Sequence, residues 1–168
     1  MTFCWTLWLL TVVACDFTQR RIPNGLVLAG AALGLGALMA QLQPFGLGWV
    51  AGLGGAAVGF GGLMLFYAAG AMGAADVKVA GVIGLWVGSA ALLPIWLVAT
   101  VLAGFHALAW VALQRWPICP QLASALSAHD ASQGVAGRHA RRQRHVPLAA
   151  YLSIATLVWM ATAGRAGF

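Results

Sequence analysis

Long apolar stretches separated by short polar connections dominate this sequence. The stretches that we expect to form helices cover residues 2–19, 25–42, 48–70, 79–113 and 147–163. A helix needs about 20 mostly apolar residues to cross the hydrocarbon core of a bilayer. The stretch 79–113 is too long for one crossing, and Pro94 is its expected point of division, because proline interrupts helical hydrogen bonding. The pattern therefore predicts an all-α fold, a polytopic membrane protein with six transmembrane helices.

The composition supports this interpretation. Of the 168 residues, 62% are hydrophobic and only 7% are charged, and the mean hydropathy is +0.89. An ordinary soluble domain has roughly 25% charged residues. A chain so poor in charge cannot cover a water-facing surface, which excludes a soluble globular domain, a disordered chain and a nucleic-acid-binding module. The expected surroundings are a lipid bilayer, and no nucleic-acid partner is expected despite the net charge of +6.

The basic residues indicate how the chain is oriented. Except for Arg165 in the tail, they fall in three connections, at Arg20, Arg21, Lys78, Arg115, Arg138, Arg141, Arg142 and Arg144. Basic residues are retained on the cytoplasmic side of membrane proteins. We therefore expect both termini to be non-cytoplasmic and a basic cytoplasmic loop of about 115–146 to join spans five and six. Residues 1–168 are expected to form a single integral-membrane domain.

Glycine and tryptophan have predicted structural roles. Glycines recur four positions apart in several stretches, as at Gly55 and Gly59 and at Gly84 and Gly88. That spacing lets helix backbones approach closely in lipid. Most of the eight tryptophans lie in or near the ends of the expected spans. Their amphipathic rings favour the membrane–water interface, so an interfacial position is expected for them.

The acidic residues are few, and two of them lie within the expected spans. There is no glutamate, and the aspartates are Asp16, Asp76 and Asp130. Asp16 lies about four residues, or roughly 6 Å, inside the end of the first span. The stretch 79–93 is short for a crossing, so the fourth span should begin near Asp76. The two carboxylates are thus expected at similar depth on the cytoplasmic side, and they meet if the first and fourth helices are neighbours.

Two carboxylates in contact have a specific chemistry. Like charges at contact distance do not both ionise easily, so the pair shares one proton. The ionised partner can take a proton from water that attacks a peptide carbonyl, and the protonated partner can donate to the carbonyl oxygen and the leaving amine. This chemistry needs no metal and no cofactor. The alternatives are structural or transport roles: Asp76 as a helix cap, Asp16 paired with Arg20, or both acids on the path of a proton-coupled transporter or channel.

The sequences around both acids resemble those of a known family. Residues 16–24 read Asp-Phe-Thr-Gln-Arg-Arg-Ile-Pro-Asn, and residues 72–78 read Met-Gly-Ala-Ala-Asp-Val-Lys. They are similar to the two catalytic blocks of type IV prepilin peptidases, in the right order and separated by two spans. The resemblance implies an aspartic-type leader peptidase that cleaves prepilin or pseudopilin precursors at the cytoplasmic face of the bacterial inner membrane. Asp16 and Asp76 correspond to the catalytic aspartates of that family.

The resemblance also implies roles for the residues beside the two acids. Pro23 and Asn24 are expected to shape the turn and cap the second helix, and Gly73 and Ala75 to set the position of Asp76. Lys78 is expected to polarise the site or to anchor the chain at the interface.

This sequence departs from the family pattern at two places. Ala75 stands where the Gly-x-Gly-Asp block has its second glycine, so an alternative is a catalytically weak relative that acts in pilus assembly. The cysteine-bearing insertion of the longer, N-methylating members is absent, so the chain resembles the short, peptidase-only form of Flp-type and tight-adherence systems.

Overall fold

The computed structural model describes residues 1–19, 21–115 and 148–163, in which all regular structure is helical. The helices are α1 (Thr2–Gln19), α2 (Asn24–Met39), α3 (Trp49–Ala68), α4 (Ala74–Arg115) and α6 (Leu148–Ala163). The prediction of an all-α fold is confirmed for this part of the chain. Apart from Arg115, the expected basic loop of 115–146 lies outside the described residues, as do Arg20, Asp130 and Arg165.

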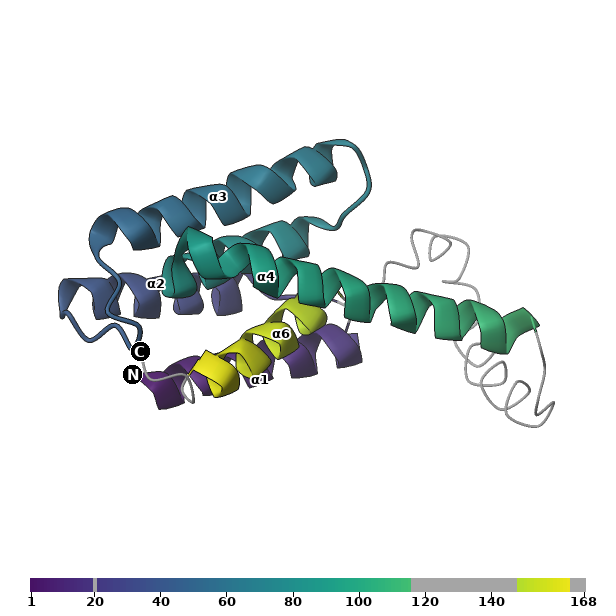
Figure 1. Cartoon of the computed structure of the whole chain (residues 1–168), viewed down its shortest axis with the longest axis horizontal. Helices are drawn as coiled ribbons and strands as arrows, with labels where there is room; N and C mark the ends of the chain where they lie inside the picture. Colours follow the sequence, from purple (N-terminus) through teal and green to yellow (C-terminus); the bar gives the residue numbers. More distant parts are fainter. Residues whose placement is uncertain (20, 116–147, 164–168) are drawn as a thin grey trace.

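Helix α4 is two helical segments joined by a sharp reversal (Figure 1). The reversal is at Gly88, where φ is 75° and ψ is 172°. Residues on both sides of it meet the same point of α3, because a Cβ at Gly59 would lie 2.5 Å from the carbonyl oxygen of Ala80 and 3.0 Å from Leu92 Cδ2. In one continuous helix those two residues would be about 18 Å apart. Residues 74–87 and 89–115 therefore run in opposite directions.

The prediction that Pro94 divides this stretch was wrong. Pro94 lies inside the second helical segment, six positions after the reversal. Proline removes one hydrogen bond from a helix but keeps a helical φ, so it can remain in a helix whose neighbours hold it. The reversal instead needs a positive φ, which glycine adopts readily because it has no Cβ. The chain therefore turns at Gly88, where the backbone needs a positive φ, and not at Pro94, where one helical hydrogen-bond donor is missing.

With this reversal, the described chain consists of six helical segments that alternate in direction (Figure 1). The end of α1, the connection from α3 to α4 and the start of α6 lie together at one end of the bundle, which we call the site end. The connection from α2 to α3 and the reversal at Gly88 lie at the opposite end. Trp159, near the end of α6, packs there against Phe45, with ring centroids 5.1 Å apart.

Glycines bring α3 and the first segment of α4 into backbone contact. Gly55 lies against Gly84, and Gly59 lies against Ala80, with no space for a further carbon atom at either glycine. Such close approach increases the number of van der Waals contacts, which drive helix association where no hydrophobic effect operates. The predicted role of the four-residue glycine spacing is confirmed at these positions. The two contacts also fix the register in which α3 runs antiparallel to α4.

Three tryptophans form a buried stack inside the bundle, towards the end opposite the site end. Trp5 stacks on Trp8 with centroids 5.0 Å apart and on Trp86 with centroids 4.5 Å apart. The indole N–H of Trp8 donates to the Leu26 carbonyl (2.7 Å), and that of Trp86 donates to the Gly30 carbonyl (3.1 Å). All three rings are buried within the bundle, and the interfacial position expected for the tryptophans stays a prediction. The stack joins α1 to α4, and the two N–H groups attach both helices to α2.

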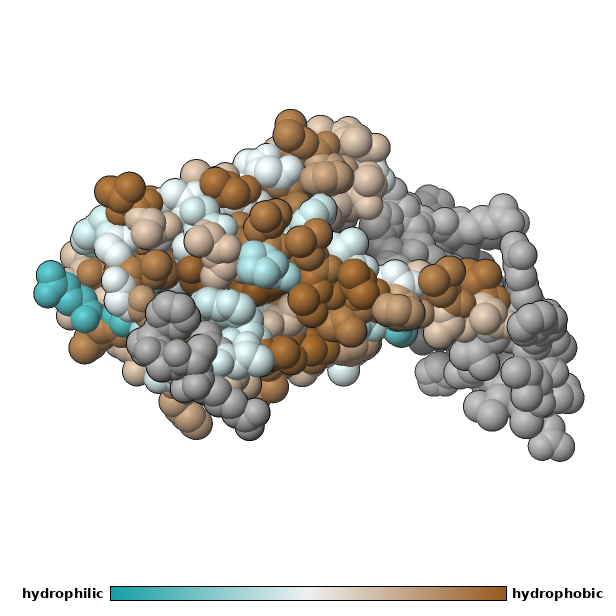
Figure 2. Space-filling view, viewed as in Figure 1, coloured by the Kyte–Doolittle hydropathy of each residue, from teal (hydrophilic) through white to brown (hydrophobic). Residues whose placement is uncertain are grey.

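Much of the surface is apolar, as Figure 2 shows for one face. Exposed large hydrophobic side chains occur on every helix, for example Leu7, Leu28, Leu65, Phe105 and Val158. Within the described residues, two stretches are long and apolar enough to cross a membrane, Trp49–Ala68 and Ala74–Ala109. The second of these contains the reversal at Gly88, so its two arms lie side by side.

The glycine contact predicts a difference between two neighbouring substitutions in α3. Gly55→Ala should lower the free energy of unfolding by about 1–3 kcal/mol, because its methyl group would overlap the Gly84 backbone. Gly54→Ala should be neutral or should raise the free energy by up to about 1 kcal/mol, because a Cβ there meets nothing within 4 Å. Unfolding of the purified protein in detergent, followed by circular dichroism, measures both. Equal effects of the two variants would contradict the backbone contact.

Candidate active site

Asp16 lies in the last turn of α1, and its side chain is only 7% exposed. Its Oδ2 accepts a hydrogen bond from the backbone N–H of Ala150, at 2.8 Å. Ala150 is the third residue of α6, where the backbone N–H groups have no acceptor within the helix. The carboxylate of one helix therefore satisfies a donor at the start of another. Arg20, the alternative partner considered for Asp16, lies outside the described residues.

Asp76 lies in the first turn of α4 and is also 7% exposed. Its Oδ2 accepts the backbone N–H of Gly73 at 3.2 Å, and its own N–H donates to the Gly73 carbonyl, also at 3.2 Å. The carboxylate makes one half of a capping box, in which the third helical residue reaches back to the N–H before the helix. Gly73 has no side chain, so its backbone carbonyl accepts the Asp76 N–H. The expectation that the fourth span begins near Asp76 is confirmed, and the carboxylate supports the helix start as well.

The tryptophan stack places the two acids at the same level of the bundle. Asp16 follows Trp5 by eleven positions, and Asp76 precedes Trp86 by ten. Trp5 and Trp86 are stacked, and their helices run in opposite directions. At about 1.5 Å per residue, the acids lie roughly 16 Å and 15 Å from the stack, both towards the site end. Two buried carboxylates thus lie at one end of the bundle, on the two helices that the stack joins.

Asn24 and Lys78 connect the two sequence blocks directly. The ammonium group of Lys78 donates to Asn24 Oδ1 at 2.9 Å, and both residues lie at the site end. The expected capping of α2 by Asn24 was wrong, because Pro23 occupies the capping position and no side chain bonds there. The backbone carbonyl of Pro23 accepts the N–H groups of Leu26 and Val27 instead, at 3.0 and 3.4 Å. The side chain of Asn24 is thereby available to bind Lys78.

Gly73 and Ala75 have different steric constraints. A Cβ at Gly73 would lie 3.1 Å from Asp76 Oδ2, which is tight, so glycine leaves room for the carboxylate. Ala75 is the second residue of α4, and its φ is not positive. An alanine is therefore accommodated there without backbone strain. The replacement of the second glycine by Ala75 does not require Asp76 to move.

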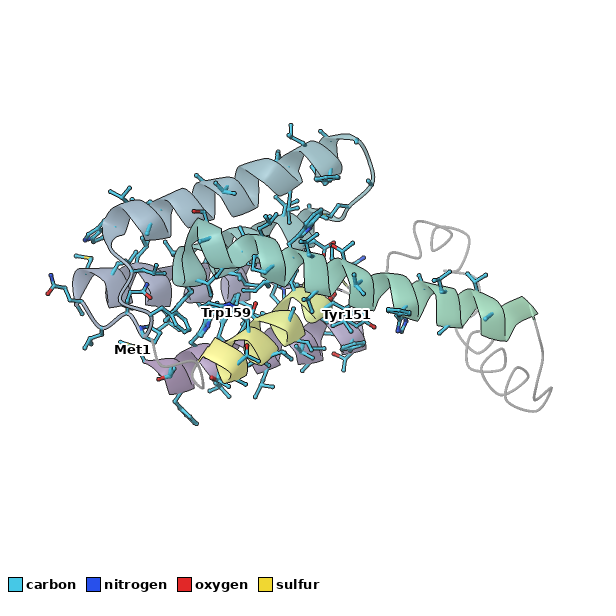
Figure 3. The ribbon with its side chains drawn as sticks, viewed as in Figure 1. Met1, Tyr151 and Trp159 are labelled. Atoms are coloured by element: carbon cyan, nitrogen blue, oxygen red, sulfur yellow. The ribbon has the colours of Figure 1, made fainter. Side chains whose placement is uncertain are left out.

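Two residues of α6, Ala150 and Tyr151, contact α1 beside Asp16, and neither was among the expected site residues. The Ala150 N–H is a backbone donor, which any residue except proline supplies, so no residue type indicates it. Tyr151, labelled with Trp159 in Figure 3, packs its ring against Phe17 and against His106 of α4, with centroids 6.1 and 5.8 Å away. In the ranges 1–19, 21–115 and 148–163, no three His, Cys, Asp or Glu side chains gather in a possible metal site.

The contact between Lys78 and Asn24 predicts energetic coupling between the two residues. Lys78→Met and Asn24→Ala should each lower the free energy of unfolding by about 0.5–1 kcal/mol, the net contribution of an exposed hydrogen bond. The double variant should lose little more than either single one, because both remove the same bond. Arg21→Met is the control, since it removes an exposed cation from the same end. Fully additive losses in detergent unfolding experiments would show that the two residues act independently.

The searches of curated proteins and of solved structures found no match. The model of the type IV leader peptidase family matches residues 3–108. The matched region is more than half of the chain and contains Asp16, Asp76 and the five residues beside them that the sequence singled out. The expected family is confirmed: the chain belongs to the type IV leader peptidase family, which implies a peptidase with protein substrates of the prepilin type.

Proposed function

We propose that this protein is an aspartic endopeptidase that removes the leader peptides of type IV prepilin-like precursors, with Asp16 and Asp76 as its catalytic pair. One observation carries the proposal. These two acids are buried at the same level and the same end of the bundle, on helices joined by the tryptophan stack. Both lie within the region that the family model matches. Two-aspartate hydrolysis requires two carboxylates close enough to share one proton, and two acids at the same level and end of the bundle can make that approach.

The proposed reaction uses one water and one shared proton. The ionised carboxylate takes a proton from the water, and the water oxygen attacks the scissile carbonyl carbon. The protonated carboxylic acid donates its proton to the carbonyl oxygen. Collapse of the tetrahedral intermediate breaks the C–N bond, and the amine leaves with a proton from the first carboxyl group. One hydroxyl of the intermediate returns its proton to the second carboxylate as the new carboxyl end forms. The pair again holds one proton at the end of the cycle. No metal and no cofactor take part in this scheme.

The proposed setting is the bacterial inner membrane, crossed by six helical segments with both termini outside. The cations Arg21 and Lys78 lie at the site end, which is therefore assigned to the cytoplasmic side. A precursor would leave its leader in the cytosol and its apolar helix in the bilayer. The scissile bond would then lie near the ends of α1 and α4, where the two acids are.

The structure also favours a specific alternative, a noncatalytic relative that assists pilus assembly. Each acid makes a bond that supports a helix start, to the N–H of Ala150 or of Gly73. Those bonds alone would explain why buried acids stand at these positions. The chemistry and the helix support can be separated, because asparagine keeps an acceptor oxygen but carries no charge and cannot take up a proton at neutral pH.

The catalytic pair predicts that Asp16→Asn and Asp76→Asn fold normally but lose activity. The free energy of unfolding of each variant should stay within about 1 kcal/mol of the wild-type value, because the amide oxygen can accept the same N–H. Leader removal should fall by at least about a hundredfold, the usual scale of general acid–base catalysis. Asp16→Ala should in addition lower the free energy of unfolding by about 1–3 kcal/mol, because the Ala150 N–H loses its acceptor. Co-expression with a prepilin-like precursor and gel analysis of its processing measure the activity.

The matched control for these variants is Gln41→Asn, an exposed polar position at the opposite end of the bundle. It should process the precursor at the wild-type rate. Normal processing by either asparagine variant, at wild-type expression, would refute the catalytic pair and favour the assembly role.

The backbone conformation at Ala75 predicts the effect of restoring the second glycine of the Gly-x-Gly-Asp block. Ala75→Gly should leave the rate of leader removal within about twofold of wild type, because Ala75 already has an unstrained backbone. It should lower the free energy of unfolding by up to about 1 kcal/mol, since glycine is the less favourable residue in a helix. A gain of tenfold or more in processing would show that Ala75 weakens the site, contrary to this geometry.

A further inference from the structure

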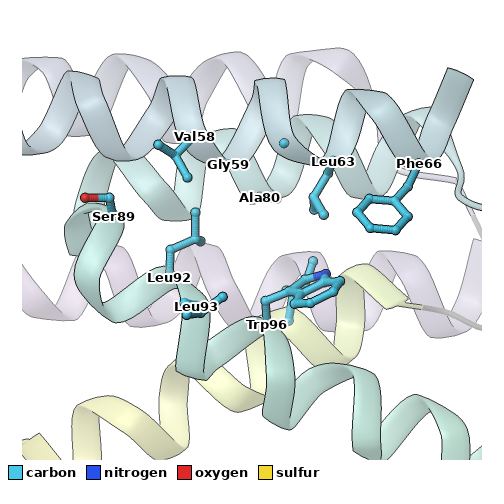
Figure 4. Close-up of a pocket in the computed structure, with 11 residues that line it drawn as sticks. Val58, Gly59, Leu63, Phe66, Ala80, Ser89, Leu92, Leu93 and Trp96 are labelled. Atoms are coloured by element: carbon cyan, nitrogen blue, oxygen red, sulfur yellow. The ribbon is translucent and has the colours of Figure 1, made fainter.

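An apolar pocket of about 160 Å³ lies between α3 and the second segment of α4 (Figure 4). Val58, Leu63 and Phe66 approach it from α3, and Leu92 and Trp96 approach it from α4. Its rim is accessible, since Val58 is 55% and Phe66 is 44% exposed. Because the surrounding surface is apolar, the occupant must be an apolar group that reaches the pocket from the side of the bundle.

The register of α3 against α4 places this pocket beside the two acids. Gly59 lies against Ala80, and the two helices are antiparallel, so one turn further along Leu63 lies at the level of Asp76. The pocket extends to Leu63 and on to Phe66, towards the site end. Its lining also includes Ala80, one turn after Asp76 and on the same face of α4.

A second helix of the site also reaches the pocket. Leu152 of α6 contributes to the lining, two residues after Ala150, whose N–H binds Asp16. The pocket therefore borders on α6, whose start binds Asp16, and on α4, which carries Asp76.

The volume of the pocket restricts what it can hold. An engineered apolar cavity of about 150 Å³ in another protein binds one benzene molecule. A pocket of about 160 Å³ therefore has room for one large aliphatic or aromatic side chain, and not for a whole helix. Only a short piece of a lipid acyl chain would fit, and it would gain little over remaining in the bilayer.

We infer that this pocket is a specificity subsite, which receives one large apolar side chain from the membrane-embedded stretch of the precursor next to the scissile bond. The inference rests on the proposed function, because a leader peptidase must fix the register of an apolar helix that carries few polar features. A side chain seated one turn from Asp76 fixes that register at the site. Filling the pocket should weaken the binding of precursors that carry the large residue and leave the binding of precursors that lack it unchanged.

Two adjacent glycines of α3 provide the test. A Cβ at Gly62 meets nothing within 4 Å and Gly62 lines the pocket, so Gly62→Leu fills the pocket without a clash in the bundle. Gly61→Leu is the matched control, because a Cβ there is equally free and Gly61 does not line the pocket. Both are assayed with a prepilin-like precursor that the wild type cleaves, and with versions in which single large apolar residues beside the cleavage point are changed to alanine.

Gly62→Leu should raise KM for the parent precursor about tenfold, the scale of burying one large side chain, with kcat within about twofold. Gly61→Leu should match the wild type. For one alanine version of the precursor the wild type and Gly62→Leu should have equal KM values, which identifies the side chain that enters the pocket. Equal KM values for both glycine variants on every precursor would overturn the subsite but leave the peptidase function standing. No cleavage of any precursor by the wild type would overturn both.

A photocrosslinking experiment tests occupancy without turnover. A benzoylphenylalanine at position 58 in the Asp76→Asn variant should crosslink to the precursor, and the same probe at position 65, exposed on α3 outside the pocket, should not. Crosslinks from position 58 to phospholipid alone, in the presence of precursor, would show that lipid occupies the pocket and would overturn the inference.

Discussion

The stack of Trp5 on Trp86 determines how the rest of the structure can be arranged around the two acids. Within the described residues, this stack is the ring contact that joins α1 to α4. Its position along each helix sets the level of Asp16 and of Asp76. The indole N–H groups of Trp8 and Trp86 both donate to carbonyls of α2, so sliding either helix would break a buried bond. A shift of one turn would displace an acid along the bundle by about 5 Å.

The close glycine contacts of α3 have a similar consequence on the other side of α4. Backbones that meet at Gly55 and Gly84 can slide only if the whole contact separates. The first segment of α4 is therefore held from two sides, by tryptophan rings and by glycine backbones. The reversal at Gly88 then returns the chain beside α3, and this second arm forms one wall of the apolar pocket. One positive-φ glycine thus creates both an extra antiparallel segment and a cavity next to the site.

The sequence predicted those features that depend on helix length and on local blocks. Counting residues from the ends of the apolar stretches placed Asp16 and Asp76 at helix ends, and the structure has them in the last turn of α1 and the first turn of α4. The position of the reversal was mispredicted at Pro94, because a missing donor is visible in a sequence but a positive φ is not. The Ala150 contact could not be predicted, because a backbone N–H leaves no mark on residue type.

The bonds of the two acids connect the chemistry of the site to the ends of the helices. A carboxylate that accepts the N–H of Ala150 has its oxygen oriented by α6, and one that accepts the N–H of Gly73 is oriented by the turn before α4. Any movement of the start of α6 therefore changes the environment of Asp16 while leaving Asp76 in its own turn. Because Lys78 binds Asn24, the start of α2 is coupled to the Asp76 side of the site. The two acids are thus supported by different elements, Asp16 by the start of α6 and Asp76 by the turn before α4.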